Sequence, residues 1–173
     1  MVKFLQGSNF IGEAMSKEKS TCFTGHRIVG SDFNIERLRE LIDCLIQLEC
    51  YTFITGGALG FDTIVAKEVL ERKRNNPAVQ LHVYVPCNNQ DAKWSERDKK
   101  TYKEILKAAD YVDIVDRPYF DGCMQERNYK MVDNASRCIC YYTGKRSGTS
   151  QTVFYAKRQG LQIFNTTTKE VII

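Results

Sequence analysis

The chain has 173 residues, enough for a single domain whose core needs neither disulfides nor metals. Its hydrophobic fraction of 43% and charged fraction of 27% argue against intrinsic disorder. No apolar run approaches the roughly 20 residues that cross a bilayer, and the N-terminus lacks the pattern of a secretory signal. We therefore expect a soluble, cytoplasmic protein without a membrane partner.

The formal net charge of +4 is weak for a nucleic-acid-binding protein, because neutralised phosphates supply most of the affinity of such proteins. Basic runs at 71–74 and 97–100 also contain acidic residues, which is typical of solvated helix faces. Seven cysteines form no Cys-x-x-Cys pair, and the two histidines are His26 and His82. The sequence thus predicts no metal site and no cofactor, and it makes a nucleic-acid partner unlikely.

The first nineteen residues differ from the rest of the chain in their pattern of apolar and polar residues. Apolar residues are scattered through 1–14 without a sustained period, and a polar stretch from Met15 leads into the first strand pattern. We interpret 1–19 as an N-terminal extension, with Met15 as the hypothetical native start. Residues 20–173 are then expected to form one domain.

From Ser20 onward, strand and helix patterns alternate along the chain. In chain order, the pattern predicts strand 21–24, helix 35–48, strand 51–55, a helix through 64–70 that stops before Asn75, strand 81–85, helix 94–109, strand 111–115, helix 121–136, strand 138–142, helix 149–159 and strand 161–164. Such alternation is typical of right-handed βαβ units. The predicted fold is a Rossmann-like three-layer α/β/α domain with a mainly parallel sheet of about six strands.

In such folds ligands bind beyond the carboxyl ends of the strands, where the first candidate segment, 24–27, falls. Gly25 permits a tight turn there, and His26 and Arg27 follow it, with Arg27 able to meet a phosphate. A glycine after a strand is also common where only the geometry of the turn requires it. This segment is therefore either part of a phosphate site or an ordinary strand-to-helix turn.

The second segment, 55–62, leads from a strand into a helix and contains Gly56, Gly57 and Gly60. Paired glycines there free backbone N–H groups to face an anion at a helix N-terminus. The spacing matches neither a Walker loop nor the usual dinucleotide fingerprint. Asp62 is expected either to bind a ribose hydroxyl or to supply favourable charge in the first helical turn.

The third segment, 143–150, combines glycines, cations and hydroxyls at a helix start, which favours a phosphate cradle. Its candidate binding residues are Gly144, Lys145, Ser147, Gly148 and Thr149. The alternative is an ordinary loop in which Thr149 caps the following helix.

The fourth segment, 124–132, places four side chains on one helix face: Met124, Arg127, Asn128 and Met131. A cation and an amide between methionines suit the rim of a cleft. The alternative pairs Arg127 with a carboxylate on its helix. Trp94 could stack on a base or anchor the core.

These four segments, in this order, resemble the SLOG (SMF/DprA–LOG) superfamily, and within it the YpsA-like family. The similarity runs from Cys22 to about Asn165 and includes further residues: Gln90, Lys93, Trp94, Tyr102, Ala109, Asp110, Asn128, Met131, Val132, Asp133, Tyr155 and Ala156. The resemblance implies a Rossmann-like domain of bacterial or prophage origin that recognises nucleotide-derived ligands such as ADP-ribose or NAD. It also makes a homodimer plausible.

The LOG relatives are phosphoribohydrolases that cleave the N-glycosidic bond of nucleoside 5′-monophosphates. Arg127 matches their helix arginine, and Gly148-Thr149 matches the Gly-Thr of their Pro-Gly-Gly-x-Gly-Thr-x-x-Glu motif. The glutamate of that motif falls on Thr152, beside Gln151, and neither residue can offset oxocarbenium-like charge. The candidate catalytic residues are Arg127, Glu126 and Asp62.

We therefore expect a domain that binds or senses a nucleotide or nucleotide-derived ligand in a cleft at the ends of the strands. Two alternatives remain open: a LOG-like nucleotide N-glycosidase, and single-strand DNA binding of the DprA kind. The weak net charge argues against the second.

Overall fold

The structure is a computed structural model that describes residues 16–171 and residue 173. The hypotheses about 1–14 and Met15 lie outside the described residues. After a short 3-10 helix, η1 (Lys17–Lys19), the strands are β1 (Ser20–Gly25), β2 (Thr52–Thr55), β3 (Gln80–Val85), β4 (Tyr111–Ile114), β5 (Arg137–Tyr141) and β6 (Gln162–Asn165). The α-helices are α1 (Ile35–Gln47), α2 (Phe61–Asn75), α3 (Glu96–Ala108), α4 (Cys123–Asp133) and α5 (Gly148–Arg158).

In the described part of the chain, the six strands form one all-parallel sheet in the order β4-β3-β2-β1-β5-β6. The predicted Rossmann-like fold is therefore confirmed. The strands β1 to β4 are added toward one edge of the sheet, and β5 and β6 are added on the other side of β1. The order of the strands therefore reverses between the parallel neighbours β1 and β5, whose register pairs Thr24 with Cys140. In open parallel sheets, a cleft forms at such a switch point, beyond the carboxyl ends of the strands.

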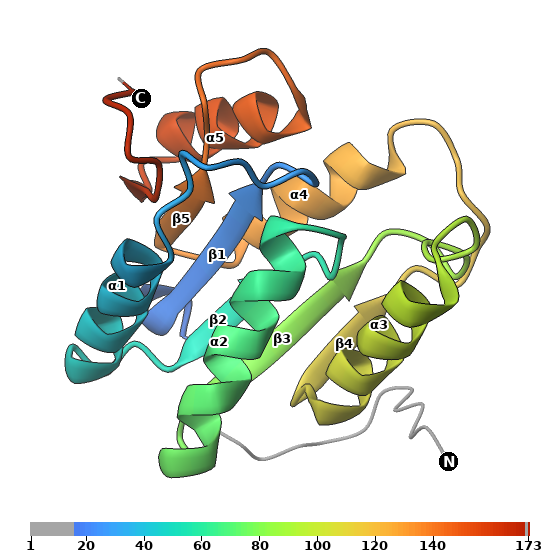
Figure 1. The fold of residues 1–173 in the computed structure, drawn as a ribbon, viewed down its shortest axis with the longest axis horizontal. Helices are drawn as coiled ribbons and strands as arrows, with labels where there is room; N and C mark the ends of the chain where they lie inside the picture. Colours follow the sequence, from blue (N-terminus) through green and yellow to red (C-terminus); the bar gives the residue numbers. More distant parts are fainter. Residues whose placement is uncertain (1–15, 172) are drawn as a thin grey trace.

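Helices α1, α2 and α3 lie on one face of the sheet and α4 and α5 on the other (Figure 1), and an apolar core lies between each set of helices and the sheet. The first contains Leu38 of α1, Phe61 of α2 and Ile105 of α3. The second contains Met131 of α4 and Val153 of α5. No helix in the described residues is long and apolar enough to span a membrane.

Two helices begin elsewhere than predicted. The second helix begins at Phe61, before the predicted Ile64, and ends at Asn75, within one residue of the predicted end. The third helix begins at Glu96, not at Trp94, because Ser95 is its N-cap and accepts a hydrogen bond from the Asp98 N–H at 3.1 Å.

Close approach of α2 to the end of β1 explains two glycines. A methyl group on Gly25 would overlap the ring of Phe61, whose side chain is fully buried. Gly60 has φ +78°, and a methyl group there would overlap the carbonyl of Arg27. These glycines therefore let the first turn of α2 pack directly against the segment that follows β1.

We predict that Gly25→Ala lowers the free energy of unfolding by about 1–3 kcal/mol, because the added methyl group overpacks the contact with Phe61. Gly148→Ala is the matched control, since a methyl group there meets no protein atom within 4 Å. Urea denaturation of both variants measures the difference. Equal stability of the two variants would contradict the assigned packing role of Gly25.

Candidate functional site

A cleft of about 270 Å³ lies at the switch point, where all four predicted segments meet. Its lining residues are Phe23, Thr24, Gly25, His26, Arg27, Ala58, Asp62, Met124, Arg127, Asn128, Ser147, Gly148 and Thr149. The structure thus brings together nine of the residues proposed from the sequence as binding residues: Gly25, His26, Arg27, Asp62, Arg127, Asn128, Ser147, Gly148 and Thr149. Phe23, Thr24 and Ala58 were not proposed, because nothing in their type signals a ligand.

The remaining candidates do not line the cleft. Gly56, Gly57 and Gly60 belong to the glycine loop (residues 56–60) between β2 and α2, of which Ala58 lines the cleft. Gly144 and Lys145 lie on the exposed part of the loop that follows β5. They were proposed because they belong to the same segment as the start of the helix. Membership of that segment does not fix the direction in which a side chain points.

Trp94 packs edge-on against Tyr102, with ring centroids 5.1 Å apart and an interplanar angle of 66°. It belongs to the core beneath α3 and not to the lining of the cleft. Of the two roles considered for Trp94, the structure gives it that of a core anchor.

The polar groups of the glycine loop bond to the protein itself. The carboxylate of Asp62 accepts the N–H of Ala58 at 3.2 Å. The Gly57 carbonyl accepts the amide of Gln90 at 3.2 Å. The N–H group of Ala58 is therefore already taken by Asp62.

Glycine at 56 and 57 has a geometric cause. A methyl group on Gly56 would overlap the Arg127 guanidinium. Gly57 has φ +61°, and a methyl group there would lie only 2.9 Å from the Val83 side chain. The loop is therefore glycine-rich because side chains pack against its backbone.

Arg127 is the most heavily bonded side chain of the site, with 8% of its surface exposed. Its Nη1 donates to the carbonyls of Gly56 and, at 3.1 Å, of Tyr84, while its Nε donates to Asn128 Oδ1 at 2.7 Å. Among the described residues, Nη2 has one weak partner, the Met124 sulfur at 4.0 Å. Arg127 therefore keeps donor capacity on Nη2 at the cleft.

Asp62 and Arg127 are both buried near Gly56. Ion pairs within 4.0 Å among the described residues include neither of them, so Arg127 is not neutralised by a carboxylate of its own helix. Burial raises the pKa of Asp62, although the positive charge of Arg127 opposes that shift. Burial likewise lowers the pKa of Arg127.

Glu126, the third catalytic candidate, lies outside the cleft. Its side chain is 69% exposed and lies 3.8 Å from Arg117. Adjacent helix positions point about 100° apart, so the burial of Arg127 turns Glu126 toward solvent. The sequence could not separate the two, because both are polar residues on the same helix.

The N-terminus of α5 forms the opposite wall. Ser147 is its N-cap: its Oγ accepts the Ser150 N–H at 3.2 Å, and the Ser150 Oγ accepts the Ser147 N–H at 2.8 Å. Ser147, and not Thr149, therefore caps the helix. The N–H groups of Gly148 and Thr149 have no acceptor within the helix and lie at its positive end.

Two features of Gly148 and Thr149 keep this helix end open to the cleft. The hydrogen bonds of the described residues include none from the Thr149 hydroxyl, which borders the cleft. A methyl group on Gly148 would meet no protein atom within 4 Å. Unlike the glycines of the loop, Gly148 therefore leaves space that the protein does not fill.

Thr152 stands where the LOG motif has its glutamate. Its side chain is almost fully buried, and its hydroxyl accepts the Asn128 amide at 3.0 Å and donates to the Gly148 carbonyl at 2.9 Å. Since Asn128 also accepts from Arg127, this chain of bonds ties α4 to the start of α5. Thr152 thus acts as a link between helices.

The β1 side of the cleft carries His26 and Arg27. The His26 Nε2 lies 3.2 Å from the Thr143 hydroxyl, and its ring packs edge-on against Tyr141. Burial lowers the pKa of His26, and the nearby charge of Lys145 adds to that shift. Arg27 is exposed, so its positive charge is available at the mouth of the cleft.

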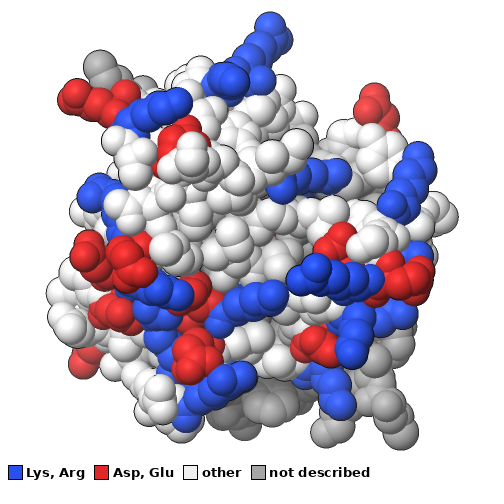
Figure 2. Space-filling view, viewed as in Figure 1, with Lys and Arg blue, Asp and Glu red and all other residues white. Residues whose placement is uncertain are grey.

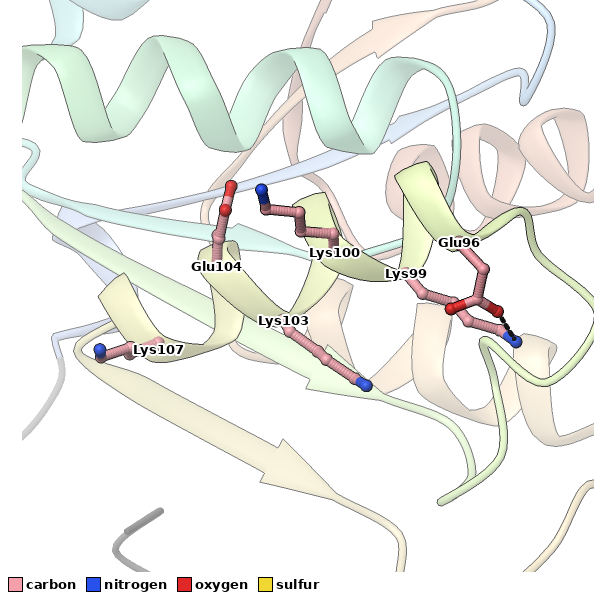
Figure 3. A pocket seen from close by; sticks show the side chains of 6 residues that line it. All are labelled: Glu96, Lys99, Lys100, Lys103, Glu104 and Lys107. Carbon is pink, nitrogen blue, oxygen red and sulfur yellow. Dashed lines mark hydrogen bonds and ion pairs between the residues drawn. The ribbon is translucent and has the colours of Figure 1, made fainter.

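A second hollow lies along α3, and the residues that line it are all charged side chains of this helix (Figure 3). It is lined by Glu96, Lys99, Lys100, Lys103, Glu104 and Lys107. Lys99 bonds to Glu96 at 2.9 Å, and acidic and basic side chains alternate over this face of the molecule (Figure 2). The hollow has the character of a solvated helix surface.

We predict that Asp62 makes stability fall as pH rises. Its pKa is raised in the folded state, so that state holds a proton more tightly than the unfolded chain does. From pH 7 down to about pH 4, the wild type should therefore gain stability relative to Asp62→Asn, whose side chain does not titrate. Urea denaturation across this range measures the difference, and a flat or opposite trend would contradict the assignment.

Comparison with known proteins agrees with the resemblance seen in the sequence. A family model described as the YspA SLOG family, YpsA, matches residues 32–171. The chain is 32% identical over 136 residues to the uncharacterised SPbeta prophage-derived protein YoqJ of Bacillus subtilis, covering 71% of this chain and 80% of that protein. It is 29% identical over 126 residues to the UPF0398 protein BH1768 of Halalkalibacterium halodurans, covering 72% and 67%.

Solved structures support the fold. DNA processing protein A from Helicobacter pylori, described for its single-stranded DNA binding mode, superposes with a TM-score of 0.60 at 18% identity, covering 84% of this chain and 64% of that one. The protein TM1055 gives a TM-score of 0.54 at 16% identity, covering 83% and 71%. The family match spans most of the sequence, and the chain belongs to the YpsA family of SLOG proteins.

Proposed function

We propose that the protein binds a nucleotide or nucleotide-derived ligand, with a phosphate of that ligand at the N-terminus of α5. The observation that carries this proposal is the open cradle formed by the N–H groups of Gly148 and Thr149 together with the Thr149 hydroxyl. Backbone N–H groups at the positive end of a helix are suited to bind a phosphate.

Positive charge lies around this cradle. Arg127 contributes its Nη2 group, and Arg27 contributes an exposed guanidinium at the mouth of the cleft. Charge-assisted bonds to phosphate are stronger than neutral ones, and a partly enclosed site increases their value. A nucleoside without phosphate should therefore bind much more weakly than its monophosphate.

The carboxyl group of Asp62 supports recognition of a sugar. It lines the same cleft as the α5 cradle, although one of its acceptor positions is taken by the Ala58 N–H. A carboxyl group keeps further hydrogen-bonding capacity in either charge state, so it can still bond to a ribose hydroxyl. The cleft of about 270 Å³ is slightly smaller than typical drug-sized pockets. It suits the phosphate and ribose, with the base toward the mouth.

Hydrolysis of the glycosidic bond has less support. The buried Thr152 hydroxyl already has both a donor and an acceptor partner, so it can neither take a proton nor stabilise positive charge on the ribose. Asp62 is the carboxylate among the cleft residues, and the buried environment favours its neutral form. We therefore favour ligand binding over turnover.

We predict that Gly148→Val abolishes nucleotide binding while the protein stays folded, because the new side chain enters space that the protein leaves empty. Thermal shift at about 1 mM AMP, ADP-ribose or NAD, with adenosine as the control ligand, tests this. A Kd of about 10 μM would raise stability by about 2.7 kcal/mol, or roughly 5–10 °C. Gln151→Ala, exposed on the same helix, is the matched control and should bind like the wild type.

Nucleotide binding by folded Gly148→Val at wild-type affinity would contradict the proposed cradle. Release of adenine from AMP by the wild type, lost in Asp62→Ala but kept in Glu126→Ala, would instead establish the N-glycosidase. Tight, salt-dependent binding of a labelled oligonucleotide without any nucleotide binding would favour the DNA-binding alternative.

A further inference from the structure

The loop between β1 and α1 (residues 26–34, the β1–α1 loop) is fastened to the segment that begins at the end of β6 (residues 165–171, the C-terminal strap). The Asn34 N–H donates to the Thr166 carbonyl at 2.9 Å, and the Thr168 N–H donates to the Asp32 carbonyl at 2.7 Å. Phe33 and Thr167 form an antiparallel bridge between these two bonds. The strap therefore pairs with the loop that carries His26 and Arg27.

A buried tyrosine fixes the same loop from the sheet side. Only 2% of Tyr141 is exposed, and its hydroxyl accepts the Gly30 N–H at 3.2 Å while donating to the Asp32 carboxylate. The other carboxylate oxygen of Asp32 lies 3.7 Å from the Lys169 ammonium. Asp32 is thus the point where the loop, the sheet and the strap meet.

The ring of Tyr141 also contacts His26, which lines the cleft. The rings of Tyr141 and His26 pack edge-to-face, with centroids 5.5 Å apart and an interplanar angle of 85°. On the other side, the Thr143 hydroxyl lies 3.2 Å from the His26 Nε2. The orientation of His26, which follows β1, is therefore set by the last residue of β5 and by the loop after it.

The strap also reaches the segment that leads to the phosphate cradle. The Tyr142 N–H donates to Asn165 Oδ1 at 3.1 Å, and the Asn165 amide donates to the Tyr142 carbonyl at 2.8 Å. Tyr142 directly precedes the loop that ends at the Ser147 cap of α5. One end of the strap thus holds the β5 side of the cleft, and its middle holds the β1 side.

We propose that Tyr141 and Asp32 are positioning residues for the cleft: their hydrogen bond, anchored by the C-terminal strap, holds His26 and Arg27 in its wall. Neither residue lines the cleft, so they act on a ligand through the loop. The contribution to ligand affinity rests on the proposed function, whereas the effect on His26 does not require a ligand.

The charge state of the pair suits this role. The hydrogen bond from Tyr141 lowers the pKa of Asp32, so the carboxylate is ionised at neutral pH. The pKa of Tyr141 is raised, first by burial and then by its bond to Asp32, so its hydroxyl keeps its proton. A neutral donor on an ionised acceptor is a charge-assisted bond, which is stronger than a neutral one.

Tyr141→Phe removes the hydroxyl and keeps the ring. Tyr142→Phe is the matched control, because the hydrogen bonds of the described residues include none from the Tyr142 hydroxyl and its ring packs on Phe154 instead. Asp32→Ala removes the other partner of the bond. It lies in a loop, and it tests the same bond should Tyr141→Phe not fold.

The first measurement needs no ligand. His26 and His82 are the two histidines, so proton NMR can follow each during a pH titration. The groups that act on His26 are Tyr141 and Thr143 by contact, and Asp32 and Lys145 by charge. We expect Tyr141→Phe to raise the pKa of His26 toward its ordinary value, because a loosened loop relieves the burial that lowers it. His82 should not change, and neither histidine should change in Tyr142→Phe.

The second measurement is AMP affinity by calorimetry. Tyr141→Phe and Asp32→Ala should each weaken binding by about tenfold, the effect of losing one such bond. The double variant should be no weaker than the weaker single variant, because both changes remove one interaction. Wild-type values for both the His26 titration and AMP affinity in Tyr141→Phe, or fully additive losses in the double variant, would overturn the proposal. If wild-type protein does not bind AMP, the proposed AMP recognition fails, and the His26 titration alone decides the positioning role.

Discussion

The buried guanidinium of Arg127 is the interaction on which the geometry of the cleft depends. It joins the Gly56 carbonyl after β2, the Tyr84 carbonyl in β3 and the amide of Asn128 on α4. Burying a charged group is costly unless it is hydrogen-bonded, and these three bonds, from Nε and Nη1, offset that cost while Nη2 stays available at the cleft. Asn128 extends the connection to Thr152 on α5, so one side chain sets the relative positions of both cleft walls.

The glycines of the site fall into two physical classes. Gly25, Gly56 and Gly60 are sites where a methyl group would overlap neighbouring protein atoms, so their role is to let segments pack. Gly148 has open space around it and stands at an unsatisfied helix end. Conversely, the N–H group of Ala58 in the glycine loop is hydrogen-bonded to Asp62. Phosphate recognition is therefore proposed at α5 and not at the glycine loop.

The alternation of strands and helices was enough to predict the sheet, because each buried strand and amphipathic helix leaves a local periodic pattern. It also placed three of the four candidate segments at one edge, since parallel strands share the direction of their ends, while the fourth was proposed from the residues on one helix face. The direction of single side chains was not predictable: Glu126 and Arg127 are neighbours, yet Glu126 is exposed and Arg127 is buried. The contact between Asp32 and Tyr141 spans 109 positions, and no local pattern reports it.

Phosphate binding at the N-terminus of α5 is tested most directly by the amide chemical-shift changes that AMP causes in a two-dimensional proton–nitrogen NMR spectrum. The account predicts that the amide signals of Gly148 and Thr149 move most, because these N–H groups gain the phosphate as an acceptor. That of Ala58 should move little, because Asp62 already accepts this N–H group. The largest changes at the glycine loop, or along the lysines of α3, would contradict the account.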